Sequence, residues 1–207
     1  MRMKVVFVLL DKFADWEFAP LASALNALPD WNVQTVSPQA KAVRSLGGLT
    51  VIPDAAVEDI SCGGIGGVVL IGGMSWRTPA AECVKNLALA AVKNSLPVCA
   101  ICDATVFLAR LGLLNNVRHT SNVLDDMKSY AGASYSGESH YQLQPCVRDG
   151  GIVTANGTAA MDFARESLIA VGAMSAEEAA KWHRLFTLGA YRAQEEAFWW
   201  FSKISSK

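Results

Sequence analysis

Short apolar runs alternate with helical patterns along most of this chain, and this alternation constrains the fold more than any other feature. Helical patterns lie near residues 16–28, 79–94, 103–112 and 158–172. Five short runs bounded by Gly, Pro, Asp or Asn predict buried strands: Lys4–Leu10, Asn32–Val36, Gly67–Ile71, Pro97–Ile101 and Ile152–Ala155. Such continuous Val, Ile and Leu runs are typical of parallel strands with helices on both faces. We therefore predict an α/β sandwich with a mostly parallel sheet and a ligand site at the carboxyl ends of its strands.

The length of 207 residues favours a single domain over residues 1–207. Ser175-Ala-Glu-Glu178 is a capping-box pattern, and it predicts the start of a helical extension at about residues 175–203. The segment 130–150 is polar and rich in Gly and Ser, so we expect loops with short strands there.

Charge and composition exclude several classes of protein. The 18 Lys and Arg residues nearly balance 19 Asp and Glu, without a block of like charges, which predicts no nucleic-acid or membrane partner. No run approaches the ~18 apolar residues of a membrane span, and Val5–Leu10 is too short for a secretory signal. An odd number of cysteines, five, without an export signal predicts a reducing, cytoplasmic setting. Cysteines and histidines lack compact ligand spacing, so we expect no metal and no other cofactor.

Cys102 lies where the apolar run Pro97–Ile101 gives way to a helical run. A side chain at such a sharp strand-to-helix turn is held out at the top of a sheet, where a nucleophile sits. A tight elbow leaves room only for small side chains two residues away, and Ala100 and Ala104 occupy those positions. Because a helix N-terminus lowers the pKa of a thiol, we predict a reactive thiolate at Cys102.

The remaining cysteines invite a plainer interpretation. Cys83, Cys99 and Cys146 are expected to be small buried apolar side chains. Cys99 and Cys102 have the C-x-x-C spacing of a redox pair, but that motif places both cysteines in the first turn of a helix. Cys99 is expected inside a strand, which argues against an exchanging disulfide.

Three predicted strand ends carry matched chemical groups: Glu17 follows the first strand, Gly72-Gly73 the third and Cys102 the fourth. The carboxyl ends of parallel strands share one edge, so we expect these groups to face one pocket. Pro20 is expected in the first turn of its helix, because an interior proline costs about 3 kcal/mol. Glu17 would then lie at or just before the helix start. Burial beside a thiolate would raise the pKa of Glu17 and let it shuttle a proton.

Backbone N–H groups supply the remaining part of the predicted site. Those of Gly72, Gly73 and Asp103 are candidates for an oxyanion hole. The Asp103 carboxylate is expected to point outward, because at the thiol it would oppose ionisation. Trp16 and Trp76 are candidate pocket walls, with ordinary packing equally open.

Several stretches together carry a resemblance to a known family: Val-Val-Phe-Val-Leu-Leu-Asp at 5–11 with Glu17 downstream, Val-Val-Leu-Ile-Gly-Gly at 68–73, Ala-Ile-Cys-Asp-Ala-Thr at 100–105, Ala-Arg-Leu-Gly-Leu-Leu at 109–114 and Asp-Gly-Gly-Ile-Val-Thr-Ala-Asn-Gly at 149–157. Over about residues 4–172 the chain resembles the PfpI (intracellular protease I) family of the class I glutamine amidotransferase-like superfamily. The resemblance implies a flavodoxin-like sandwich, an elbow cysteine at Cys102, an acidic partner at Glu17 and an oxyanion hole at Gly73 and Asp103.

Two positions depart from the family pattern. Protease-like members carry a histidine directly after the elbow cysteine, where this chain has Asp103, and other members carry one about twenty residues later, at Asn122. His119 and His140 are therefore the candidates to complete a Cys–His pair, and His183 in the C-terminal extension is the weakest.

These features favour a hydrolase that uses Cys102 as nucleophile on an amide, a peptide or another carbonyl-like substrate. One alternative is a glyoxalase or deglycase that acts on reactive aldehydes or adducts, as in other members of the superfamily. Another is a non-enzymatic redox-sensing or stress-protective protein in which Cys102 is oxidised, and a third is a binding scaffold with a vestigial elbow. The missing adjacent histidine argues against efficient peptide cleavage, because the leaving amine needs an acid.

Four adjacent aromatic residues, Phe198-Trp-Trp-Phe201, lie in the predicted C-terminal extension. On a helix they point around more than half of the circumference, so another surface must cover some of them. The chain's own sheet and a homodimer interface are both open, and we expect a homodimer.

Overall fold

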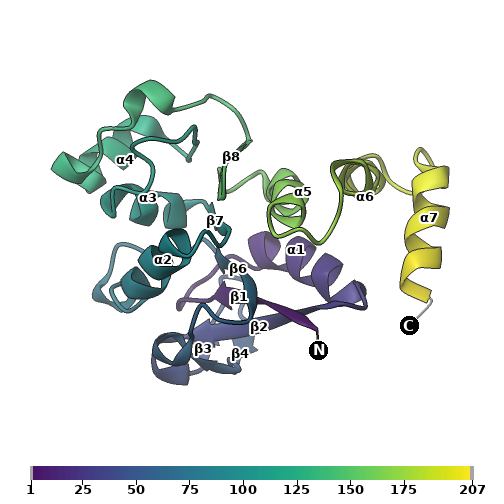
Figure 1. Cartoon of the computed structure of the whole chain (residues 1–207), viewed down its shortest axis with the longest axis horizontal. Helices are drawn as coiled ribbons and strands as arrows, with labels where there is room; N and C mark the ends of the chain where they lie inside the picture. Colours follow the sequence, from purple (N-terminus) through teal and green to yellow (C-terminus); the bar gives the residue numbers. More distant parts are fainter. Residues whose placement is uncertain (1, 206–207) are drawn as a thin grey trace.

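The computed structural model describes residues 2–205, so residue 1 and residues 206–207 of the predicted domain lie outside the described residues. Within the described range, seven strands form one sheet in the order β5-β2-β1-β6-β7-β9-β8 (Figure 1). Every pair in it is parallel except β8 with β9. The sheet strands are β1 (Met3–Val8), β2 (Trp31–Ser37), β5 (Ala55–Ala56), β6 (Ile65–Leu70), β7 (Val98–Ile101), β8 (Cys146–Asp149) and β9 (Ile152–Ala155).

All of the predicted strands are present within one or two residues at their ends. The sequence pattern missed β5 and the hairpin of β3 (Val43–Arg44) with β4 (Thr50–Val51), because two-residue strands carry no periodicity. It also did not locate β8, an edge strand in the polar segment 130–150.

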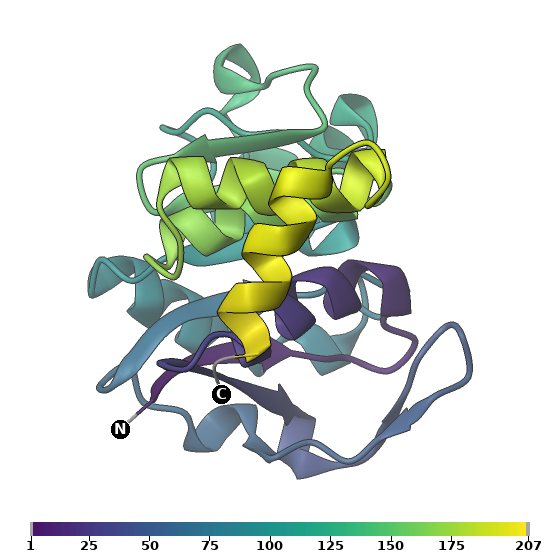
Figure 2. The same cartoon turned by 90° about the vertical axis from the view of Figure 1, so that its right-hand side faces the viewer.

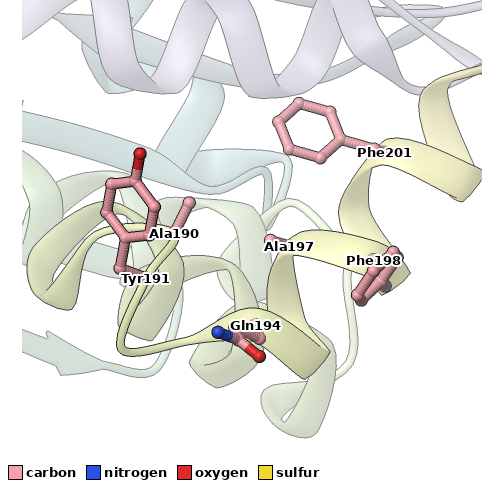
Figure 3. Close-up of a pocket in the computed structure, with 6 residues that line it drawn as sticks. All are labelled: Ala190, Tyr191, Gln194, Ala197, Phe198 and Phe201. Atoms are coloured by element: carbon pink, nitrogen blue, oxygen red, sulfur yellow. The ribbon is translucent and has the colours of Figure 1, made fainter.

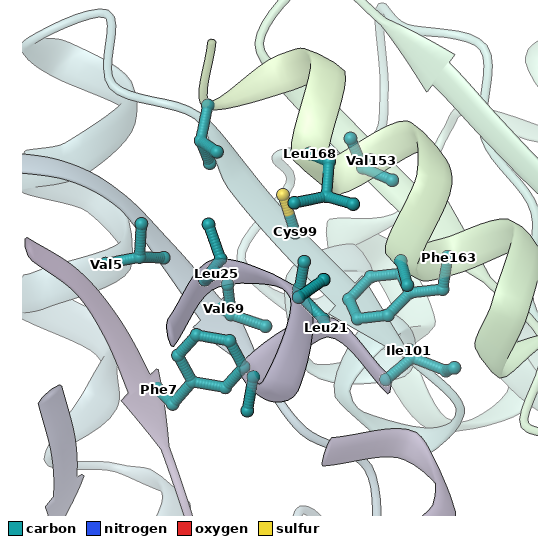
Figure 4. Packing of buried hydrophobic residues seen from close by; sticks show 14 of the residues in the cluster. Val5, Phe7, Leu21, Leu25, Val69, Cys99, Ile101, Val153, Phe163 and Leu168 are labelled. Atoms are coloured by element: carbon teal, nitrogen blue, oxygen red, sulfur yellow. The ribbon is translucent and has the colours of Figure 1, made fainter. Parts of the chain in front are cut away.

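Helices cover both faces of the sheet, which confirms the predicted α/β architecture. The helices are α1 (Asp15–Ala27), α2 (Val84–Lys93), α3 (Asp103–Arg110), α4 (Leu124–Ala131), α5 (Ala160–Ala170), α6 (Ala176–Leu188) and α7 (Gln194–Ser205). Residues of α1, α5, α6 and α7 pack in one apolar cluster, and those of α2, α3 and α4 pack in the other. Successive side chains of a strand point to opposite faces, so Phe7 joins the first cluster and Val8 the second. In the view of Figure 4, Leu21 lies between Phe7 and Phe163 of the first cluster.

The start of α1 corrects one prediction. The helix begins at Asp15, so Pro20 lies inside it and Glu17 lies in its first turn instead of at or before its start. A proline lacks the N–H that would bond to the carbonyl four residues earlier, here that of Trp16. The expected placement of Pro20 in the first turn was therefore wrong by about one turn.

The predicted helical extension consists of two helices joined by a turn. The capping box is confirmed: the Ser175 hydroxyl accepts a hydrogen bond from the Glu178 N–H, and the Glu178 side chain accepts one from the Ser175 N–H. Helix α6 ends at Leu188, before Gly189, which has a φ of 82° that favours glycine, so the expected helical extension is interrupted there. The sequence did not predict α4 either.

Helix α7 lies against α6 at the edge of the molecule (Figure 2). Trp200 is only 5% exposed and joins the core cluster, and an Arg184–Glu196 ion pair also ties the two helices. Phe198 is 79% exposed, and with Tyr191 and Phe201 it lines a shallow cavity of about 470 Å³ (Figure 3). No helix among residues 2–205 is long and apolar enough to cross a membrane.

Candidate active site

Cys102 sits between β7 and α3 in a backbone conformation that side chains rarely adopt. Its φ of 59° and ψ of −132° lie outside the regions favoured by L-residues. Hydrogen bonds hold it there: its N–H donates to the Ala155 carbonyl at 2.9 Å, and its carbonyl accepts from the Thr105 N–H at 3.0 Å and hydroxyl at 2.6 Å. Strained residues of this kind cluster at functional sites.

Glu17 faces the Cys102 thiol from the first turn of α1. A methyl group on Gly157 would lie 3.0 Å from both the Cys102 Sγ and the Glu17 Oε1, so the two side chains border the same small space. One on Gly72 would lie 2.3 Å from Glu17 Oε2 and 2.5 Å from Cys102 Cβ. Glycines at these two positions therefore make room for the pair.

Burial sets the protonation of Glu17, whose side chain is fully buried. Desolvation raises the pKa of Glu17 to about 7, with smaller opposing contributions from the Cys102 thiol and the Gly72 backbone. Neither carboxyl oxygen makes a hydrogen bond of regular geometry with another described residue. Glu17 can therefore take up or release a proton near neutral pH.

The thiol itself departs from the prediction. Burial and the Glu17 carboxylate raise the pKa of Cys102, although the Asn122 amide and the Asp103 N–H act in the opposite direction. The helix N-terminus thus stabilises the thiolate, but desolvation and the neighbouring negative charge outweigh that effect. Cys102 and Glu17 compete for one proton as a coupled pair.

Asn122 is the site residue that sequence reasoning placed in register but did not assign to the site. Its amide Nδ2 donates to Cys102 Sγ at 3.2 Å, and its Oδ1 accepts from the Gly157 N–H at 2.8 Å. The carbonyl of Gly157 in turn accepts from the Trp16 indole at 2.9 Å. The Gly157 contact fixes the orientation of the amide, so its N–H points at sulfur. The signal in the sequence was its position, where the resemblance implied a histidine in other members.

The three backbone N–H groups predicted for an oxyanion hole lie in different places, and that of Gly72 is directed at Glu17 instead of the cavity. The Asp103 N–H lies at the Cys102 thiol. Gly73 pairs with Phe13, but the two hydrogen bonds of that pair run from Ala14 to Gly72 and from Met74 to Lys12. The Gly73 N–H therefore donates neither of these two hydrogen bonds, and Gly73 lines the cavity.

The Asp103 carboxylate points away from the thiol, as expected from the sequence. Arg77 binds it through Nε to Oδ2 at 2.8 Å and Nη2 to Oδ1 at 2.6 Å. The same guanidinium binds Asp126 of α4 through Nη1 to Oδ1 at 3.0 Å. These bonds raise the pKa of Arg77, Asp126 contributing most, so it remains a cation.

The histidine candidates do not join this group. His119 is fully buried, with Nδ1 at the Val117 carbonyl (2.8 Å) and Nε2 at the Tyr135 hydroxyl (2.7 Å), so neither ring nitrogen is left for Cys102. Burial lowers the pKa of His119 and keeps it neutral. His140 contributes its backbone carbonyl to His119 and is not among the described residues that line the cavity. His183 lies on α6 near Asp162 and is not among the described residues that line the cavity.

The two candidate pocket tryptophans have different positions. Trp16 is half-exposed and lines the cavity. Trp76 is buried instead, where its indole donates to the Ile71 carbonyl at 2.7 Å and its ring packs on Phe107. Its role as a pocket wall is therefore not supported.

The cavity over Cys102 has a volume of about 500 Å³, which is a size typical of small-molecule sites. Glu17, Cys102, Asp103 and Asn122 line it, and Leu46 and Met74 are among its apolar lining. Within residues 2–205, no three His, Cys, Asp or Glu side chains are grouped to hold a metal ion. The cysteines in this range are free thiols.

A parallel α/β sandwich with a strained elbow cysteine and a buried carboxyl group beside it defines the class of protein. The chain belongs to the DJ-1/PfpI family, whose sequence profile matches residues 3–170. This confirms the resemblance drawn from the motifs.

Individual relatives agree with that assignment. Bacillus subtilis (strain 168) YdeA, named an uncharacterized protease, is 41% identical over 160 residues, covering 77% of this chain and 79% of YdeA. YoaZ of the same strain, also named an uncharacterized protease, is 31% identical over 189 residues, covering 88% and 90%. A solved DJ-1 superfamily protein from Agrobacterium tumefaciens is similar with a TM-score of 0.83 and 35% identity, covering 90% of this chain and 98% of that one.

Proposed function

We propose that this protein is a cysteine-dependent hydrolase in which Cys102 attacks the carbonyl carbon of a small amide or a related substrate and Glu17 moves the protons. The observation that carries the proposal is the shared space of the Cys102 thiol and the fully buried Glu17 carboxyl group. A group with a pKa of about 7 can serve both as acid and as base at neutral pH.

The first step follows from that geometry. The thiol proton passes to Glu17 as the sulfur–carbon bond forms, and the carbonyl π electrons move to oxygen. The N–H groups of Gly73 and Asp103 are placed to stabilise that oxyanion. The Asn122 N–H holds sulfur in position. The Cys102–Glu17 pair can carry out this step once it has lost the first of its two protons, at a pH near 7.

The second step returns the proton. The carbonyl re-forms, the carbon–nitrogen bond breaks, and Glu17 donates its proton to the leaving amine, which leaves a thioester on Cys102. Glu17, again a carboxylate, then removes a proton from a water whose oxygen bonds to the thioester carbon. The carbon–sulfur bond breaks, Glu17 returns the proton to sulfur, and the carboxylic acid leaves. One residue thus covers the tasks that histidine performs in other cysteine hydrolases.

A second candidate is an enzyme that acts on small reactive aldehydes. Addition of the thiol to an aldehyde gives a thiohemiacetal without a leaving group, so the absence of a histidine at the thiol carries no penalty. The small cavity, about 500 Å³, suits such a substrate equally well.

The test is turnover of two substrate panels, one of small amides and aryl esters and one of 2-oxoaldehydes, by the protein and three variants. Cys102→Ala should abolish activity, and Glu17→Gln should lower kcat by roughly 10²–10⁴-fold. Cys62→Ala is the matched control at a thiol outside the cavity and should be unchanged. Equal turnover by the Cys102→Ala variant and the unmodified protein would refute both candidates, and the active panel decides between them.

A further inference from the structure

Acidic side chains outnumber basic ones around the cavity over Cys102. Arg77 is the only basic side chain among the described residues that line it. The Asp103 and Asp126 carboxylates together engage Nε, Nη1 and Nη2 in four hydrogen bonds. A guanidinium has five N–H groups, so a single one is left for any other acceptor.

The net charge of the groups around the cavity is therefore negative. Two carboxylates face one guanidinium, and Glu17 adds negative charge whenever it is ionised. Neighbouring cations on this face are also paired, Lys128 with Glu138 and Arg110 with Glu82. An anionic group entering the cavity thus meets two carboxylates and a lining cation that is already paired.

Among the described residues, the rim of the cavity adds no cation for an anion. Trp16, Leu46 and Met74 form an apolar rim, and Met74 is 67% exposed. Seating a carboxylate against such walls costs desolvation without a partner. An uncharged electrophile avoids both penalties.

We propose that Asp103 and Asp126, by occupying Arg77, make the Cys102 cavity select uncharged electrophiles over carboxylate-bearing ones of the same size. Arg77 thus links Asp103, next to the elbow, to Asp126 of α4. It does not bind a substrate carboxylate. The inference rests on the proposed function in that Cys102 is the attacking atom, and it narrows the substrate class to neutral carbonyl compounds.

Alkylation of Cys102 tests this selectivity without any turnover. Iodoacetamide and iodoacetate have nearly the same size and differ by one charge. The alkylation rate of Cys102 by each reagent is followed by peptide mass spectrometry at low ionic strength. Each rate is then divided by the rate at which the same reagent alkylates 2-mercaptoethanol, which removes the intrinsic difference between the reagents. We expect the normalised preference for iodoacetamide to be roughly tenfold. Added salt should reduce it.

Asp126→Asn removes one partner of Arg77 and should reduce the preference about fivefold. Asp125→Asn is the matched control, because it removes the same charge from the same exposed helical turn without touching Arg77. A preference equal to that of 2-mercaptoethanol, an inversion toward iodoacetate, or equal shifts in both variants would overturn the proposal. Failure of all substrates to turn over, with the preference intact, would reject the proposed function alone.

Discussion

Around Cys102 the backbone and side chains are held by hydrogen bonds from several segments, whereas α7 is joined to α6 by two ion pairs and buries only Ala197 and Trp200. The site tolerates strain and a fully buried acid because its surroundings fix them in place. Helix α7 instead leaves Phe198 largely in solvent. The two regions show that precise geometry is concentrated at the carboxyl edge of the sheet, while the C-terminal helices carry apolar surface without such constraint. Substitutions in each region test this contrast.

Gly72→Ala should have the largest effect. Its new methyl group would lie 2.3 Å from Glu17 Oε2 and 2.5 Å from Cys102 Cβ, so the elbow must shift. We expect a loss of roughly 3 kcal/mol in unfolding free energy and an alkylation rate of Cys102 changed by about 10²-fold. Urea denaturation and alkylation kinetics measure both. Gly63→Ala, where nothing lies within 4 Å, is the control, and a similar loss there would refute the steric explanation.

Glu17→Gln should change how stability depends on pH. The pKa of Glu17 is raised from 4.5 to about 7 in the folded state, so folding favours its protonated form. That stabilisation is fully present below the unfolded pKa of 4.5 and is lost as pH rises through about 7. The glutamine variant cannot lose it, so its stability relative to the unmodified protein should rise by about 3 kcal/mol between about pH 4 and pH 8.5. Urea titrations at both pH values measure this, and a constant difference would contradict the burial argument.

Cys102→Gly should be more stable than Cys102→Ala by about 1–2 kcal/mol, because glycine relieves the positive φ of 59°. The same pair of substitutions at Cys62, which lacks a positive φ, should give the opposite order. Thermal or urea unfolding distinguishes them. Equal stabilities at position 102 would show that the elbow is not strained.

Phe198→Ser with Phe201→Ser should have the smallest effect on folding, within about 0.5 kcal/mol, since both side chains are largely exposed. We expect the pair to weaken the homodimer predicted from the aromatic cluster, as read by sedimentation velocity. Leu143→Ser, at another exposed apolar side chain, should leave association unchanged. Unchanged sedimentation in the double variant would remove α7 from the interface.

The sequence predicted the part of the site that strand topology dictates. Glu17, Gly72 and Cys102 follow different parallel strands, and such strands end at one edge, so their convergence could be derived. The contact of Asn122 could not, because its loop is placed by distant bonds such as Thr120 N–H to the Thr154 hydroxyl at 2.9 Å.

Residue type alone misled in two cases. His119 is a candidate only because it lies near the register of Asn122, and its ring is turned toward Tyr135 in the core. The thiol pKa was expected to fall at the helix N-terminus, but the depth of burial and the nearness of Glu17 reverse the direction. Both depend on packing distances that no local pattern contains. The two-residue strands carry no local signal, whereas Gly189 is itself a helix-stop signal within a longer helical pattern.

Trp16 gives the site an optical signal. Its indole is bonded to the carbonyl of Gly157, and the N–H of the same residue holds the Asn122 amide against the Cys102 sulfur. An event that displaces that amide, such as acylation or oxidation of the thiol, changes the surroundings of a half-exposed indole. Intrinsic fluorescence, compared with a Trp16→Phe variant, therefore offers a label-free and continuous record of the chemistry at Cys102.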